Sequence, residues 1–191
     1  MNLTTRRMVE SAILIAIGTV LSILSFQGPW ALGGSITVAS MLPLVFIAWR
    51  HGTKWGLFSA FIYALLQMML GFKNVGYGRN VGEMVLIAVL DYVLAFTVIG
   101  LSALWKDRFQ DKRTGLMVGI IVTFVLRFLC HFVSGWFIWE ALWPNELGYA
   151  APLWSLMYNG SYMLPEILIT GIIAWLSYAP LKKFWLGEDL R

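Results

Sequence analysis

The chain has 191 residues, of which 59% are hydrophobic and 13% are charged, and its mean hydropathy is +0.75. This composition is too apolar for an ordinary soluble domain and predicts an integral membrane protein. The formal net charge of +4 falls mostly in short connections between apolar stretches. It therefore indicates membrane topology and argues against a nucleic-acid partner.

Six apolar stretches are candidates for membrane helices, because crossing the hydrocarbon takes roughly 20 residues. In chain order they cover about residues 8–26, 35–49, 55–72, 83–105, 115–140 and 153–179. The connections between them are too short to fold alone. The sequence therefore predicts a single all-α domain over residues 1–191, an integral membrane bundle of six transmembrane helices.

The basic residues are divided unevenly between the two sides of this predicted bundle. If the N-terminus lies in the cytoplasm, that side holds 11 of the 14 Lys and Arg residues: Arg6, Arg7, Arg50, Lys54, Lys106, Arg108, Lys112, Arg113, Lys182, Lys183 and Arg191. Cytoplasmic connections carry such an excess. We therefore expect both termini to be cytoplasmic.

The first apolar stretch places Ala12 and Ala16 four positions apart. Small residues at this spacing let helix backbones approach closely in membranes. From the pattern alone, packing inside the bundle is favoured over docking of another membrane protein.

Polar residues lie deep inside three later stretches: Asp91 in VLIAVLDYVLAF, His131 in VLRFLCHFVSGWFIW and Asn159 in LWSLMYNGSYML. At about 1.5 Å per residue, Asp91 and His131 lie roughly 12–13 Å below the outer surface. Asn159 and Tyr63 fall near the same level. A carboxylate at this depth costs a few kcal/mol, so we expect these four side chains to converge on a site for a small, polar, cationic ligand.

Each of these residues also has a purely structural interpretation. Asp91 can pair with Arg127, His131 can bond a neighbouring carbonyl, and Asn159 can hold two helices together. Glu166, which follows Pro165 in the sixth stretch, has no assigned role, and pairing with Arg127 or with the surroundings of Glu10 is open. Four polar or aromatic groups at one depth favour a site over four independent structural roles.

Aromatic residues gather near the predicted outer side, where membrane proteins commonly carry them. They are Trp30, Trp136, Trp139, Trp143, Trp154, Tyr77, Tyr149, Tyr158 and Tyr162. Trp139 is eight residues beyond His131, about 80° around a helix, so both can line one wall. A desolvated cation over such rings gains about 2 kcal/mol, which suits a flat heteroaromatic cation.

The sequence contains no motif typical of ATP binding or of metal binding. There is no G-x-x-x-x-G-K-[ST] motif, so the chain carries no Walker loop for ATP. Two histidines and the single Cys130 cannot form a His/Cys metal cluster. We expect no cofactor and no metal.

Four segments together resemble the thiamine-specific substrate-binding subunit (S component) of energy-coupling factor transporters. They are LGGSITVASMLPLVFIAWRHGTKWGLFSAFIYALLQMMLG, VLIAVLDYVLAFTVIGLSAL, LRFLCHFVSGWFIW and WSLMYNGSYMLPE. The resemblance covers nearly the whole chain, in order. It implies a multi-pass protein of the bacterial cell membrane that captures thiamine from outside. It also implies partners, namely a transmembrane coupling subunit and two ATP-binding subunits, and it implies that the chain is not an enzyme.

The resemblance also implies roles for individual residues. Asp91 would hold the aminopyrimidine, His131 and Trp139 would pack on the thiazolium, and Asn159 would hydrogen-bond the ligand. Further wall residues would be Tyr63, Trp30, Trp154 and Tyr158. Ala12 and Ala16 would dock the coupling subunit. Some relatives carry Glu at Asp91 and many carry Tyr at Trp154, so those two contacts differ in this chain.

Three other functions remain open from the sequence. A proton-coupled secondary transporter could use Asp91 or Glu166 as the proton carrier. An S component for another vitamin, such as riboflavin or biotin, would share the general fold. An intramembrane hydrolase could pair Ser134 with His131, although no oxyanion-hole motif accompanies them.

Overall fold

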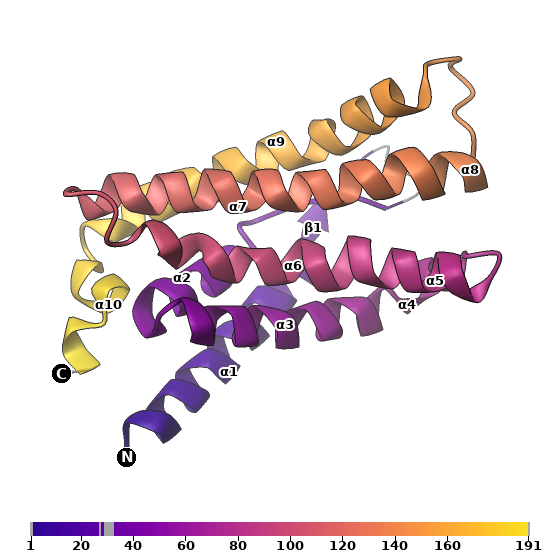
Figure 1. Cartoon of the computed structure of the whole chain (residues 1–191). Coiled ribbons are helices and arrows are strands. Elements are labelled where there is room, and N and C mark those ends of the chain that lie inside the picture. The colour runs from indigo at the N-terminus through magenta and orange to yellow at the C-terminus, as the bar shows by residue number, and fades with distance from the viewer. Residues whose placement is uncertain (1, 27, 29–32, 191) are drawn as a thin grey trace.

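The computed structural model describes residues 2–26, 28 and 33–190, and in these residues it is almost entirely helical (Figure 1). Within the described residues, three helices are long and apolar enough to cross a membrane. They cover Val81–Trp105, Lys112–Leu142 and Ala151–Tyr178. These match the last three predicted stretches to within a few residues, while the count of six spans stays a prediction.

The N-terminal part contains features that the apolar pattern did not reveal. Helix α1 (Leu3–Ile23) is followed by β1 (Ser25–Phe26) and β2 (Ile36–Thr37), which pair antiparallel with Ser25 opposite Thr37. Helix α2 (Leu42–His51) has only 10 residues, about 15 Å of helix. The expected helix over 35–49 is therefore much shorter. Ala39 takes a positive φ of 55°, which interrupts the helix, and Pro43 then favours a helix start at Leu42.

The third and fourth predicted stretches form a helical hairpin. Helix α3 (Thr53–Leu70) leads through α4 (Phe72–Val75) into a long composite helix. That helix runs through α5 (Val81–Ile87), a π-helical segment η1 (Ala88–Leu94), α6 (Ala95–Thr97) and a 3₁₀ segment η2 (Val98–Trp105). A Cβ added to Gly100 would lie 2.5 Å from the Leu57 backbone nitrogen. Glycine thus allows η2 to pack directly against the α3 backbone.

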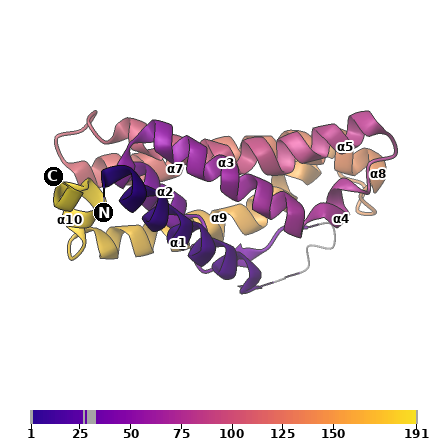
Figure 2. The ribbon, with the colours of Figure 1, turned by 90° about the horizontal axis from the view of Figure 1, so that it is seen from below.

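The C-terminal half supplies the two longest helices. Helix α7 (Lys112–Ser134) continues through a π-helical segment η3 (Gly135–Trp139) into α8 (Glu140–Leu142). Helix α9 (Ala151–Tyr178) runs back beside it, and α10 (Lys182–Leu186) and η4 (Glu188–Leu190) close the chain. Figures 1 and 2 show α7 and α9 side by side along the bundle.

Both chain ends lie at the same end of the bundle (Figures 1 and 2). There, buried Arg50 of α2 contacts Glu10 of α1 and Asp189 of η4 at 2.7 and 2.6 Å. Arg6 bonds both carboxylates as well. This ionic clasp, made of Arg6, Glu10, Arg50 and Asp189, ties three segments together across the whole length of the sequence.

Candidate functional site

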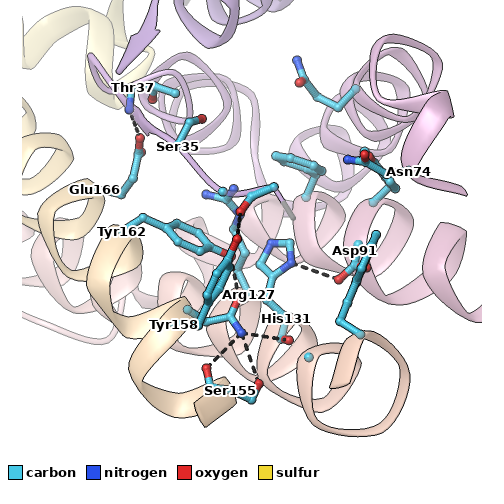
Figure 3. Close-up of a pocket in the computed structure, with 18 of the residues that line it drawn as sticks. Ser35, Thr37, Asn74, Asp91, Arg127, His131, Ser155, Tyr158, Tyr162 and Glu166 are labelled. Atoms are coloured by element: carbon cyan, nitrogen blue, oxygen red, sulfur yellow. Dashed lines mark hydrogen bonds and ion pairs between the residues drawn. The ribbon is translucent and has the colours of Figure 1, made fainter. Parts of the chain in front are cut away.

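A cavity of about 200 Å³ lies among α7, α9, η1 and the residues before α2 (Figure 3). Most of the predicted site residues line it: Asp91, His131, Trp139, Trp154, Tyr158 and Asn159. Two residues without an assigned role, Arg127 and Glu166, line it as well. Three of the four residues predicted to converge, Asp91, His131 and Asn159, therefore meet in one place.

Asp91 is the acceptor for three side chains of the α7–η3 helix. Its Oδ1 lies 3.2 Å from His131 Nδ1, and its Oδ2 accepts bonds of 2.8 Å from both Ser134 Oγ and Trp139 Nε1. These neighbours offset part of the cost of desolvating a carboxylate. Asp91 does not pair with Arg127, which was one structural interpretation of the sequence.

Both helices that meet at Asp91 are π-helical there. Asp91 lies in η1, and Trp139 ends η3. A π-helical turn holds an extra residue, so it changes the direction in which later side chains point, and such turns are frequent at functional sites. Counting α-helical turns from His131 therefore does not place Trp139 accurately.

Asn159 connects α9 to the α7 backbone and to its own helix. Its Nδ2 donates to the His131 carbonyl at 3.3 Å and to the Ser155 carbonyl at 3.0 Å. Its Oδ1 accepts a 2.6 Å bond from the Tyr162 hydroxyl. The amide thus fixes the wall of the cavity around His131 as well as contributing to its lining.

Arg127 and Glu166 form the second charged region of the cavity. The Arg127 guanidinium carbon lies 4.8 Å from the centre of the Phe96 ring. Among the described residues, its Nε and Nη1 have no hydrogen-bond partner, and neither does Glu166 Oε2. Two donor nitrogens of Arg127 and one acceptor oxygen of Glu166 are thus buried without a partner beside the cavity that both residues line, and Figure 3 shows Glu166 and Asp91 on opposite sides.

Residues 33–37, here called the strap, cross the cavity beside α9. The Tyr158 hydroxyl donates to the Gly33 carbonyl at 2.8 Å, and the Thr37 N–H donates to Glu166 Oε1. A Cβ at Gly34 would lie 2.6 Å from the Tyr162 ring. Tyr158, Tyr162 and Glu166, which contact the strap, are thus four residues apart on one face of α9. This contact was not predicted, although the spacing of Tyr158, Tyr162 and Glu166 is visible in the sequence.

Three predicted residues, Tyr63, Ala12 and Ala16, do not line the cavity. Tyr63 does not line the cavity; its fully buried ring packs against Phe96, and its hydroxyl donates to the Gly18 carbonyl at 3.3 Å. Trp30 is outside the described residues. Ala12 and Ala16 lie on the exposed face of α1, so they do not serve packing within the bundle.

The cavity therefore combines three carboxylates (Asp91, Glu140 and Glu166), one guanidinium, one imidazole and several aromatic rings. Ser134 has no exposed surface and donates its hydroxyl to Asp91, which does not suit a nucleophile activated by His131. A cationic or dipolar aromatic molecule matches this lining much better.

Comparisons with known proteins agree with this arrangement. Residues 8–185 match the model of the thiamine transporter protein family, Thia_YuaJ. The thiamine transporter ThiT of Bacillus subtilis is 29% identical over 184 residues, which cover 90% of each chain. ThiT of Lacticaseibacillus paracasei is 24% identical over 158 residues, covering 78% of this chain and 76% of that protein.

A solved structure, that of ThiT from Listeria monocytogenes, is similar in fold. Its TM-score is 0.77 at 25% sequence identity, and the match covers 96% of this chain and 99% of the other. Since the family model spans nearly the whole sequence, the chain belongs to the thiamine transporter protein family.

Proposed function

We propose that this protein is the thiamine-binding membrane subunit of an energy-coupling factor transporter. The observation that carries the proposal is the cavity around Asp91, where a buried carboxylate lies beside Trp139 and His131. Thiamine has a cationic thiazolium ring joined to an aminopyrimidine. A buried negative charge flanked by aromatic faces stabilises such a cation.

The geometry favours one orientation of thiamine over the other. Asp91 already accepts three hydrogen bonds, so its main contribution is its charge, which we assign to the thiazolium. The aminopyrimidine offers an N–H donor next to a ring-nitrogen acceptor. Glu166 Oε2 and the Arg127 N–H groups complement that pair. This orientation replaces the sequence-based assignment of the aminopyrimidine to Asp91.

The strap is the part of the wall that we assign to ligand entry and release. It is held to α9 by hydrogen bonds at Gly33 and Thr37. Gly33 and Gly34 both have positive φ, 106° and 98°, which other residues rarely adopt. Opening this segment would expose the cavity, and closing it would exclude water from the bound cation.

Delivery of thiamine requires partners in this proposal. The exposed face of α1 carries Ala12 and Ala16 among large apolar side chains such as Ile13 and Ile17. We assign this face to a transmembrane coupling subunit that works with two ATP-binding subunits. Small residues between larger ones allow a partner helix to approach closely.

Tryptophan fluorescence of the purified chain tests the proposed ligand. Trp139, Trp143 and Trp154 line the cavity, so bound thiamine should quench their emission. We expect saturable quenching by thiamine at submicromolar concentration, with no response to riboflavin or biotin. A response to another vitamin instead of thiamine would contradict the assigned ligand.

Uptake into vesicles separates the coupled transporter from a proton-driven one. Vesicles that contain this chain without ATP-binding partners should show no thiamine accumulation when a pH gradient is imposed. Accumulation driven by that gradient would contradict the proposed coupling and favour the secondary transporter.

A further inference from the structure

Glu140 lines the cavity but has no role in the function proposed above. It begins α8 and directly follows Trp139, which lines the same cavity. Figure 1 shows α8 at the end of the bundle opposite the two chain termini. Burying part of a third carboxylate beside one cavity costs free energy, so its presence there calls for an explanation.

The Glu140 side chain is held in place through one of its two oxygens. Its Oε1 accepts bonds from the Asn145 N–H at 3.0 Å and from Asn145 Nδ2 at 2.7 Å. Asn145 is itself fixed by Tyr149, because its Nδ2 donates to the Tyr149 carbonyl at 2.9 Å and its Oδ1 accepts from the Tyr149 N–H at 3.0 Å. The other oxygen, Glu140 Oε2, is buried and has no hydrogen-bond partner among the described residues. The loop between α8 and α9 therefore fixes a carboxylate whose hydrogen bonds are incomplete, which stability alone does not explain.

The charged residues that line the cavity are mostly acidic. They include the three carboxylates of Asp91, Glu140 and Glu166, while Arg127 is the only Lys or Arg among the described residues of the lining. Charges interact more strongly beside a partly desolvated cavity than in water. The lining therefore favours a cationic ligand and opposes an anionic one.

Two basic residues at the same end of the bundle do not reverse this balance. Arg79 reaches α8, where its Nη1 donates to the Ala141 carbonyl at 3.4 Å, but its guanidinium pairs with Glu83 at 2.8 Å. The Lys73 ammonium lies 5.8 Å from the centre of the Tyr77 ring. Neither Arg79 nor Lys73 lines the cavity, so neither is placed to hold a phosphate group inside it.

We propose that Glu140 is a specificity-determining residue, which restricts the cavity to thiamine with a free hydroxyl group and excludes its phosphate esters. The inference rests on the proposed function, which places the thiazolium beside Asp91 and Trp139. The thiazolium carries the hydroxyethyl group, so this group lies on the Glu140 side of the cavity. Esterification there adds a charge of about −1.5 to −2 near pH 7. Repulsion between like charges is a common means of rejecting a close analogue of the correct ligand.

Competition titration of the full-length chain with thiamine and thiamine monophosphate tests the proposal. The unchanged chain should bind thiamine at least about tenfold more tightly than the monophosphate. Glu140→Gln keeps the oxygen that accepts from Asn145 and replaces Oε2 with an N–H donor. This variant should narrow the affinity ratio on the order of tenfold, which corresponds to about 1.4 kcal/mol.

Glu146→Gln is the matched control, because it removes the same charge from an exposed position in the same loop. Its affinity ratio should stay within about twofold of the ratio in the unchanged chain. Glu140→Ala is a second variant, which also removes the bonds to Asn145 and should narrow the ratio as well. Thermal unfolding and the thiamine affinity of each variant report whether its fold is intact.

Equal affinity of the unchanged chain for thiamine and its monophosphate would overturn the inference and leave the proposed function standing. A preference that survives in both Glu140 variants, or that narrows equally in Glu146→Gln, would overturn it as well. If the unchanged chain does not bind thiamine, the proposed function fails and the inference fails with it.

Discussion

Trp139 donates its indole N–H to Asp91 at 2.8 Å, although 48 positions separate the two residues in the sequence. The bond joins two π-helical segments, and it places an aromatic face directly beside a buried carboxylate. Ser134 donates to the same Oδ2 atom. The Asp91 side chain is therefore oriented before any ligand arrives, and this preorganisation lowers the cost of binding a cation.

The proposed orientation of thiamine predicts that replacing Arg127 weakens thiamine binding. Arg127→Met should weaken thiamine binding by about 1–3 kcal/mol, because the ring nitrogen of the aminopyrimidine loses its charged donor. Arg113→Met is the control, since Arg113 contacts Trp175 at the other end of α7. Equilibrium titration measures both. Equal affinity in Arg127→Met and the unchanged chain would contradict the orientation.

The strap predicts a change in binding kinetics. Tyr158→Phe removes the hydroxyl that holds the Gly33 carbonyl, so thiamine should dissociate about fivefold faster, at roughly 1 kcal/mol per hydrogen bond. Tyr178→Phe is the matched control on the same helix, because the buried Tyr178 hydroxyl has no partner among the described residues. Stopped-flow fluorescence gives both rates, and identical dissociation in the two variants would argue against the strap.

Gly34 offers a second test of the strap. Gly34→Ala places a methyl group 2.6 Å from the Tyr162 ring at a φ of 98°, so the strap must shift away from α9. We expect thiamine affinity to fall at least tenfold. Gly148→Ala carries the same penalty of a positive φ, 73°, in open space, and should bind as the unchanged chain does. A similar loss in both variants would show that backbone strain, and not the strap, is responsible.

The ionic clasp predicts a pH-dependent contribution to stability. The hydrogen bond from Arg50 lowers the pKa of Asp189 below its ordinary value. A lowered carboxyl pKa stabilises the fold above the ordinary value of about 4, and that stabilisation is lost as the pH falls below it. Asp189→Asn should therefore lower the unfolding temperature by about 2–4 °C at pH 7.

The same difference should shrink as the pH falls below about 4, because the unfolded chain then binds a proton at Asp189 that the folded chain, with its lowered pKa, does not yet bind. Asp107→Asn is the control, since Asp107 pairs with Lys112 and its side chain is 88% exposed. Scanning calorimetry in detergent measures the series. If the difference in unfolding temperature between Asp189→Asn and the unchanged chain stays constant with pH, the Asp189 carboxylate is not its source.

Much of the candidate site could be predicted because burying a charge in a membrane is expensive. Asp91, His131 and Asn159 stand out in apolar surroundings, and depth alone indicated that they converge. Tyr63 was misplaced because depth does not tell which way a side chain points. Its ring turns away from the cavity toward Phe96 and Gly18.

Other features depend on contacts that hydropathy does not encode. Helix α2 is short because backbone geometry at Ala39 interrupts it, and the strap is held by hydrogen bonds to α9. The ionic clasp joins Glu10 to Asp189 through Arg50, across most of the sequence. Periodicity reports which face of a helix is apolar, and it contains no information on such long-range pairs.

Removing the charge of Asp91 is the most direct test of the proposed thiamine site. We would measure the affinity of the unchanged chain and of Asp91→Asn for thiamine and for an analogue whose thiazolium is replaced by a neutral ring of the same shape. Asparagine keeps the size of the side chain and removes its charge. The account predicts that Asp91→Asn costs more than about 2 kcal/mol with thiamine, and much less with the neutral analogue. An equal loss with both ligands, or no loss with thiamine, would contradict a site built around the thiazolium cation.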